Sequence, residues 1–210
     1  MMKEKIVLIG GGGLAGILIE LIKNFTEYEI VGILDSRLKV GQIIQGVAVL
    51  GSGDLLSKLY ADGIKNACIA VGSIKVDNKR KMLYEKAKRI GFAMPSLIHP
   101  QVIISRNSKI NEGVCILAGT VIQTGSSIGE NVLVYSGVII EHDCHVNSNV
   151  HICPGAILSG GCVIGENSYI GAGATVIQGI VIGKDVMVGA GSVVTSDTPD
   201  GVTIRGVPAK

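Results

Sequence analysis

The stretch ICPGAILSGGCVIGENSYI, residues 152–170, decides the architecture of the second half of the chain. Its aliphatic residues Ile152, Leu158, Ile164 and Ile170 stand six positions apart, and the residues between them are mostly small or polar. Neither the 3.6-residue period of a helix nor the alternation of a simple strand gives this spacing. A period of six is typical of a solenoid whose chain turns a corner after each short strand.

The same rule holds over most of the second half. Every sixth residue from Ile104 to Val194 is aliphatic, and the residue two places before it is generally small or β-branched. Three hexads make one triangular coil, and successive coils stack about 4.8 Å apart through backbone hydrogen bonds. The pattern predicts a left-handed parallel β-helix in which each aliphatic side chain points into the prism.

The first half follows another pattern, in which strand-like and helix-like segments alternate. The expected strands are residues 5–10, 29–35 and 66–72, and the expected helices are residues 13–25, 52–63 and 74–91. Such alternation favours parallel strands joined by right-handed crossovers. The sequence therefore predicts an α/β Rossmann-like half-domain over residues 1–98, followed by the β-helix over residues 99–210.

Composition limits the class of protein. Hydrophobic residues make up 47% and charged residues 17%, which is typical of a folded globular chain. No apolar run approaches the roughly 18 residues of a membrane span, and the start lacks the features of a signal peptide, so we expect a cytoplasmic protein. A net charge of +2 and 3% aromatic residues argue against a nucleic-acid partner. The five cysteines form no CxxC pair and are expected as buried thiols.

A glycine-rich loop, GGGGLAG at residues 10–16, follows the first expected strand and opens a helix. Gly11, Gly13 and Gly16 satisfy G-x-G-x-x-G, and Asp35 ends the second strand. Because the segment holds at most half of a dinucleotide-binding fold, a mononucleotide or nucleotide-sugar diphosphate at the helix N-terminus fits better. Gly72 would line the same crevice. The alternative is that these glycines serve tight packing only.

One outer column of the predicted prism is built of small residues. Positions two after the aliphatic residue, read once per coil, are Ser136, Pro154, Ala172 and Ala190. They would leave a shallow groove suited to a slender ligand such as a pantetheine arm. The alternative is that prism corners simply tolerate small residues.

The segment EHDCH, residues 141–145, concentrates polar side chains in an otherwise apolar repeat. A neutral imidazole at His142 is a natural base near pH 7, and a carboxylate partner fixes its tautomer. Neighbouring side chains on a strand point apart, so Asp143 needs a corner to reach the ring. His145 and His151 share a phase on successive faces and could meet on one metal ion only across a trimer, as in γ-type carbonic anhydrases. The favoured alternative for His145 is an ordinary surface histidine. Cys144 is interpreted as packing.

The whole chain resembles the NeuD/PglD-like family of bacterial sugar acetyltransferases. The resemblance is carried by VLIGGGGLAG, GILDS, SLIHP, EHD, HICPGA and GVPAK in matching order. It implies acetyl-CoA as co-substrate, no metal, and homotrimers with active sites between neighbouring prisms. It implies His142 as the base, Asp143 as its acid partner, and contacts to acetyl-CoA from His151, Ala172 and Ala190.

The resemblance also implies a sugar-nucleotide pocket in the first domain, formed by Gly12, Gly13, Leu14, Asp35, Ser36 and Gly72. Two positions near the acceptor depart from the family pattern. Leu14 stands where one branch often has His, and Tyr135 stands where an Asn is common. These departures bear on the identity of the acceptor more than on the base or the cofactor.

The leading hypothesis is direct acetyl transfer from acetyl-CoA to an amino group of a UDP- or dTDP-linked amino-deoxy sugar, with His142 as general base. A second keeps the fold but acetylates a hydroxyl, as in sialic acid O-acetylation. A third is a γ-carbonic-anhydrase-like metalloenzyme using His145 and His151. A fourth is a non-catalytic scaffold that binds nucleotide sugars.

Overall fold

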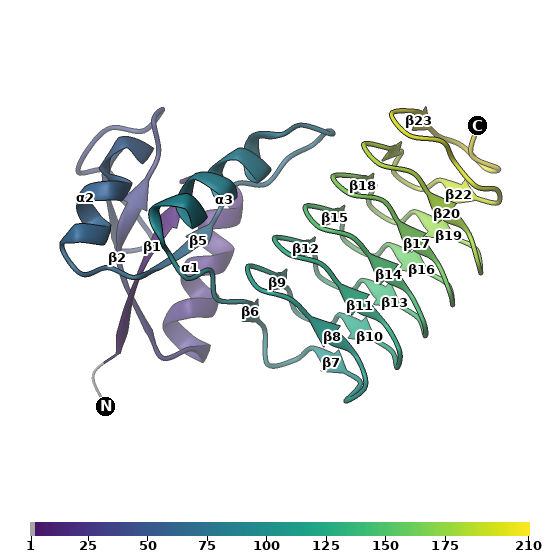
Figure 1. Cartoon of the computed structure of the whole chain (residues 1–210), viewed down its shortest axis with the longest axis horizontal. Coiled ribbons are helices and arrows are strands. Elements are labelled where there is room, and N and C mark those ends of the chain that lie inside the picture. Colours follow the sequence, from purple (N-terminus) through teal and green to yellow (C-terminus); the bar gives the residue numbers. More distant parts are fainter. Residues whose placement is uncertain (1–2) are drawn as a thin grey trace. The chain divides into compact units, whose positions relative to one another are not determined.

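A computed structural model describes residues 3–210 and divides them into two compact units. The first unit contains the residues up to Gly72 together with Lys79–Leu97, and the second contains Ser73–Asn78 and Ile98–Lys210. Figure 1 shows a mixed α/β unit and a stack of triangular coils.

The first unit is built on a five-stranded sheet with the order β3-β4-β2-β1-β5. All neighbours in it run parallel except β3 and β4, which are antiparallel. Its elements are β1 (Glu4–Ile9), α1 (Gly13–Phe25), β2 (Tyr28–Leu34), β3 (Ile43–Ile44), β4 (Val47–Gly51), the 3-10 turn η1 (Gly53–Leu55), α2 (Leu56–Ala61), β5 (Asn66–Ile69) and α3 (Lys79–Ile90). The α/β half-domain predicted from the strand–helix alternation is confirmed.

The third helix is shorter than predicted. It begins at Lys79 and not at residue 74. The hydroxyl of Ser73 accepts a hydrogen bond from the N–H of Lys75 (3.2 Å) and lies 2.9 Å from the carboxylate of Asp77. Such local side-chain bonds compete with helical hydrogen bonding, and segment Ser73–Asn78 is grouped with the second unit.

The second unit is a left-handed parallel β-helix of two-residue strands in three sheets of six, five and seven strands. The strands are β6 (Leu97–Ile98), β7 (Ile103–Ile104), β8 (Lys109–Ile110), β9 (Cys115–Ile116), β10 (Val121–Ile122), β11 (Ser127–Ile128), β12 (Leu133–Val134), β13 (Ile139–Ile140), β14 (His145–Val146), β15 (His151–Ile152), β16 (Ile157–Leu158), β17 (Val163–Ile164), β18 (Tyr169–Ile170), β19 (Thr175–Val176), β20 (Val181–Ile182), β21 (Met187–Val188), β22 (Val193–Val194) and β23 (Thr203–Ile204).

The hexad rule is confirmed by the core of the prism. From Ile116 to Val194, every aliphatic residue of the six-residue series is at most 2% exposed. Each strand pairs with the strand one coil away in exact register, for example Ile140 with Ile122 and with Leu158. Full burial of such a side chain stabilises a fold by about 1.5 to 3 kcal/mol, so the repeat is the main source of stability of this unit.

Residues 3–210 contain no helix that is long and apolar enough to cross a membrane.

Candidate active site

The side chains of His142 and Asp143 meet at a corner of the prism. The corner follows β13 of the six-stranded sheet and precedes β14 of the five-stranded sheet. Nδ1 of His142 lies 2.9 Å from Oδ2 of Asp143, and both side chains are exposed in the single chain. Because a carboxylate can only accept, Nδ1 carries a proton, and in the neutral imidazole Nε2 then holds the lone pair. This geometry suits the roles expected from the sequence, a base at His142 and an orienting acid at Asp143.

Asp143 holds a backbone conformation that favours glycine. Its φ is +58°, whereas Gly125 in the coil before and Gly161 and Gly179 in the coils after occupy the same corner at φ of +70° to +76°. A non-glycine residue in this left-handed region is strained, although Asp tolerates it better than most. The left-handed turn brings the carboxylate back beside the imidazole, which a straight strand does not allow.

Two glycines make room for the pair. A side chain at Gly160, one coil after His142, would place its Cβ 2.5 Å from Nε2 of the imidazole. A side chain at Gly125, one coil before, would collide with the carboxylate of Asp143. Sequence reasoning missed both roles. The available signal was that Asp143 interrupts a corner position that is otherwise glycine in the adjoining coils.

His151 lies on another face of the prism. It belongs to β15 of the seven-stranded sheet, is 6% exposed, and its ring centroid is 6.1 Å from that of Tyr169. Burial raises the pKa of the neighbouring Cys153 thiol, although its hydrogen bond with Tyr169 opposes the rise. Burial and the same bond raise the pKa of Tyr169. The groups beside His151 therefore remain neutral near pH 7.

The column of small residues runs along the edge between the seven-stranded and six-stranded sheets. Pro154, Ala172 and Ala190 are exposed, and a Cβ added at Gly173 or at the equivalent glycines of the adjoining coils would meet nothing within 4 Å. Within residues 3–210 the N–H groups of Ala172 and Ala190 donate no hydrogen bond. An open edge with outward amide donors fits an extended pantetheine chain, whose amide carbonyls accept hydrogen bonds.

The predicted site residues therefore fall on two edges of one prism. His142 and Asp143 lie where the six-stranded sheet meets the five-stranded sheet, while Ala172 and Ala190 lie where it meets the seven-stranded sheet. One whole face separates the base from the open edge. A single chain does not bring these two sets of residues together.

A pocket in the first unit opens at the carboxyl ends of its parallel strands. Its lining includes Asp35 and Ser36, which the sequence predicts, together with Gly10, Val71 and Lys79. Such crevices are where open α/β sheets bind ligands. The first helix, α1, starts within the glycine-rich loop and has no side-chain cap. The N–H groups of its first turn therefore favour an anion.

Asp35 ties the glycine loop to the segment that follows β2. Its carboxylate accepts from the N–H of Gly11 (2.9 Å) and from the N–H of Arg37 (2.8 Å). Burial alone would raise the pKa of this carboxyl, but the two backbone hydrogen bonds and the nearby charges of Arg37 and Lys79 hold the pKa below its usual value.

The remaining predicted residues of this unit are spread over the loop. Gly12 and Gly13 are exposed at the start of α1, and Gly72 is exposed after β5. Leu14 is 6% exposed and packs into the core of the unit. Two of the expected pocket residues, Asp35 and Ser36, thus line the pocket itself.

Cys144, next to Asp143, carries a thiol that could in principle act as a nucleophile. Cys144 is buried with its Sγ 3.2 Å from the carbonyl of Ser159, and the hydrogen bond with Cys162 together with burial raises its pKa. It is therefore unsuited to act as a nucleophile.

The metal site considered from the sequence involves His145, which is exposed with Nδ1 2.8 Å from the hydroxyl of Ser127. In the described part of the chain, no three His, Cys, Asp or Glu side chains could hold a metal ion.

Both units match known protein families. Residues 5–87 match the PglD N-terminal domain, and residues 125–160 and 161–196 match the bacterial transferase hexapeptide family of six repeats. The GDP-perosamine N-acetyltransferase from Caulobacter crescentus, solved as a histidine-to-alanine variant with CoA and GDP-perosamine, is 36% identical over 98% of this chain and 95% of its own, with a TM-score of 0.91. The chain belongs to the NeuD/PglD-like family of sugar acetyltransferases.

A second NeuD/PglD-like relative has the same extent. The acetyltransferase domain of PglB from Neisseria gonorrhoeae, solved with acetyl coenzyme A, is 37% identical over 99% of this chain and 98% of its own, with a TM-score of 0.91. WeeI from Acinetobacter baumannii, 21% identical over 99% of both chains with a TM-score of 0.64, shares the fold. A search of curated proteins finds no match.

Proposed function

We propose that this NeuD/PglD-like chain transfers the acetyl group of acetyl-CoA to an amino group of a nucleotide-linked amino sugar. The observation that carries the proposal is the oriented base on an exposed corner, with His142 Nδ1 2.9 Å from Asp143. The relatives solved with CoA and GDP-perosamine, or with acetyl coenzyme A, support the same chemistry.

The reaction needs one base and placed donors. The amine nitrogen attacks the carbonyl carbon of the thioester, the C–N bond forms, and the C–S bond breaks. Nε2 of His142 takes the proton that the amine loses, and the proton then passes to the leaving sulfur. Asp143 holds the ring and stabilises the imidazolium. Backbone N–H groups at the open edge, such as those of Ala172 and Ala190, supply hydrogen-bond donors for the acyl group and the pantetheine chain.

The nucleotide is assigned to the pocket of the first unit. Lys79 and the uncapped start of α1 favour the negative charge of a diphosphate. The leading hypothesis from the sequence names UDP or dTDP, although the sequence does not reveal which nucleotide is bound, and the relative from Caulobacter crescentus was solved with a GDP-linked sugar. We therefore propose a nucleotide-linked amino sugar as the acceptor. The experiment described below identifies its nucleobase. Because nucleotide sugars and acetyl-CoA are cytoplasmic metabolites, we place the reaction in the cytoplasm.

We further propose that the active unit is a homotrimer. The outer side of the six-stranded sheet carries a row that we call the outer row, in which five of six residues are apolar: Ile103, Val121, Ile139, Ile157, Thr175 and Val193. Ile103 is 65% exposed in the single chain. The other five residues of the outer row are half-buried in the single chain. A mostly apolar row that is partly open to water supports self-association.

The outer row also explains how one site forms from two prisms. If three copies turn this sheet toward a common axis, the edge that carries His142 in one copy meets the edge that carries Ala172 in the next. The base and the open edge then lie together, although one whole face separates them within a chain.

The test is release of coenzyme A thiol from acetyl-CoA with a panel of GDP-, UDP- and dTDP-linked 3- and 4-amino-6-deoxy sugars, and with free sialic acid. Release with an amino sugar supports the proposal and names its nucleotide. Release with sialic acid alone would show O-acetylation instead. No release from any of them, with acetyl-CoA not bound in a direct titration, would contradict an acetyltransferase.

A further inference from the structure

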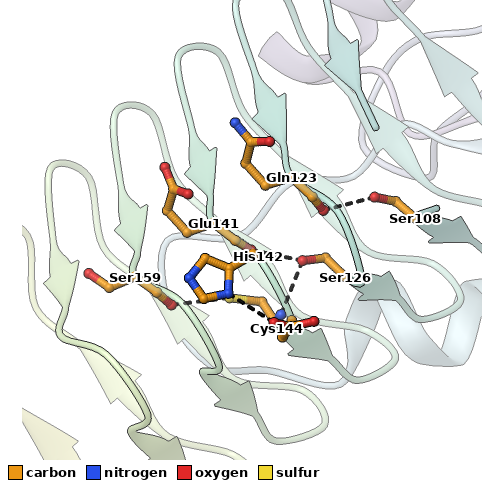
Figure 2. Close-up of polar contacts among 8 residues, drawn as sticks. Ser108, Gln123, Ser126, Glu141, His142, Cys144 and Ser159 are labelled. Carbon is orange, nitrogen blue, oxygen red and sulfur yellow. Dashed lines mark hydrogen bonds and ion pairs between the residues drawn. The ribbon is translucent and has the colours of Figure 1, made fainter. Parts of the chain in front are cut away.

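The corner that carries His142 is closed from behind by one hydroxyl group. Ser126 lies one coil earlier, is 1% exposed, and faces the inside of the prism. Its Oγ donates to the carbonyl oxygen of Glu141 (2.8 Å) and accepts from the N–H of Cys144 (3.0 Å). Figure 2 shows both bonds converging on Ser126, with the His142 ring on the outside of the same corner. Both ends of the corner, residues 141–144, are thus held by a single atom.

These two hydrogen bonds of Ser126 matter because the corner that they hold contains Asp143. Asp143 is held at φ of +58°, a conformation that costs free energy for any residue but glycine. Strained residues persist only where their surroundings over-determine them. The N–H of Asp143 donates to the carbonyl of Thr124 (3.0 Å), and the carbonyl of His142 accepts from Gly161 (2.8 Å). Ser126 completes this set of bonds around the pair.

The equivalent position is different in the next two coils. There the inward residues are Cys144 and Cys162, whose thiols lie 3.2 Å from the carbonyls of Ser159 and Ile177. A thiol is a weaker hydrogen-bond donor and acceptor than a hydroxyl. The corners they support carry Gly161 and Gly179, which adopt the left-handed conformation without strain.

One coil before Ser126, Ser108 donates to the carbonyl of Gln123 (2.9 Å) at a corner that carries Gly125. A hydroxyl alone therefore does not mark a strained corner, but the Ser126 hydroxyl bridges both ends of the corner that holds the left-handed Asp143.

We propose that Ser126 is a positioning residue for the acetyl transfer: by bridging Glu141 and Cys144 it keeps the carboxylate of Asp143 turned toward His142. The proposal rests on the proposed function, because it concerns the same base. It predicts that losing the Ser126 hydroxyl slows turnover while leaving the affinities for both substrates nearly unchanged.

The chain supplies a matched control. Ser168 is also 1% exposed, donates to the carbonyl of Gly183 (2.8 Å) and accepts from the N–H of Val186 (3.0 Å). The corner that it closes also holds a left-handed aspartate, Asp185, at φ of +53°. Ser168→Ala removes the same two bonds from an equally strained corner that carries no histidine. A loss that is merely structural should appear equally in both alanine variants.

Activity is compared for wild type, Ser126→Ala, Ser126→Thr and Ser168→Ala. We expect Ser126→Ala to lower kcat by about 10- to 100-fold, the range for a displaced catalytic group, with KM within about twofold. Ser126→Thr keeps the hydroxyl and should restore most of kcat, and Ser168→Ala should resemble wild type. Should Ser126→Ala fail to fold, Ser126→Cys replaces it. The prism accepts a thiol at this position, since Cys144 and Cys162 hold it in the next coils, and kcat should then lie between those of wild type and His142→Ala.

A second readout needs no substrate. The ring nitrogen resonances of His142 are assigned by comparison with His142→Ala, which is practical with four histidines in the chain. They should shift in Ser126→Ala and remain in place in Ser168→Ala. Because this measurement is independent of turnover, it tests the positioning role even if the assigned reaction is wrong. Equal kcat in the two alanine variants, with unmoved His142 signals in both, would overturn the proposal.

Discussion

The imidazole of His142 lies where a side chain on Gly160 would have to be. A Cβ at residue 160 would come within 2.5 Å of Nε2 and 2.6 Å of Cε1. Gly160 is buried and has an ordinary φ, so the backbone itself would accept alanine there. The requirement for glycine at this position comes from the imidazole of His142 and not from the backbone at residue 160.

Gly160→Ala should therefore damage catalysis more than stability. The new methyl group displaces the ring of His142, and a displacement of about 1 Å can cost about 100-fold in rate. Steady-state kinetics should show a kcat lowered by about that factor with KM little changed. Gln178→Ala, in the same column one coil further, is the control and should retain activity. Full activity in Gly160→Ala would mean that His142 is not the base in the position described.

Replacing Asp143 by glycine should change stability and activity in opposite directions. Asp143→Gly relieves the left-handed strain and should raise the free energy of unfolding by up to about 1 kcal/mol, while removing the partner of His142 and lowering kcat. Asp143→Asn keeps a residue that tolerates this conformation but loses the charge, so it should lose activity without gaining stability. Thermal unfolding and kinetics on the three proteins test the prediction. A glycine variant that is both less stable and fully active would contradict it.

The first unit should lose stability in acid through Asp35. Its folded-state pKa is lowered, so this carboxylate stabilises the fold at neutral pH and the contribution is lost as pH falls below the ordinary carboxyl range, near pH 4. Asp35→Asn should lower the free energy of unfolding at pH 7 by about 1 kcal/mol, the difference between hydrogen bonds to a charged and to a neutral acceptor.

The free energy of unfolding of Asp35→Asn should also depend less on pH than that of the wild type. As the pH falls below the ordinary carboxyl value near 4 and on through the lowered pKa of Asp35, the wild type should approach Asp35→Asn in unfolding midpoint, because the carboxylate becomes protonated. Denaturant titrations at several pH values measure this. Asp54→Asn is the control, because Asp54 is an exposed carboxylate on η1 of the same unit. Parallel curves for wild type and Asp35→Asn would show that the two backbone bonds do not depend on charge.

The outer row should control assembly. Ile139→Lys places a charge in the middle of the apolar face, where burial against another copy would be costly. We expect monomers by light scattering and turnover lowered at least about 100-fold, because the two edges of the site no longer meet. Val163→Lys changes the same hexad position on the five-stranded sheet and should leave assembly intact. An Ile139→Lys trimer of normal activity would contradict the shared site.

The sequence was sufficient for the prism because its rule is local and repeated. Each aliphatic residue such as Ile140 has the same neighbours at the same spacing, so one hexad predicts the surroundings of the next. The pairing of His142 with Asp143 was predictable only on condition of a corner between them. The structure supplies that corner through the left-handed Asp143.

Other features depend on contacts between coils that a reading along the chain does not show. The Gly160 requirement depends on the direction in which the His142 ring turns, and the role of Ser126 depends on two bonds made 15 and 18 residues away. In the first unit the antiparallel pair β3 and β4 was missed, because β3 has only two residues and β4 only five, and such short strands give little periodic signal.

In the proposed reaction, His142 is the general base for direct transfer of the acetyl group from acetyl-CoA to an amine of a nucleotide-linked sugar. The most direct measurement incubates wild type and His142→Ala with acetyl-CoA and the amino sugar that gives thiol release, and analyses the products by mass spectrometry and NMR. We predict a single acetyl group, on nitrogen, with wild type, and a rate lowered by about 100- to 10,000-fold in the variant, the usual share of a general base. An acetyl group on oxygen, or a folded His142→Ala protein of near-normal rate, would contradict the mechanism.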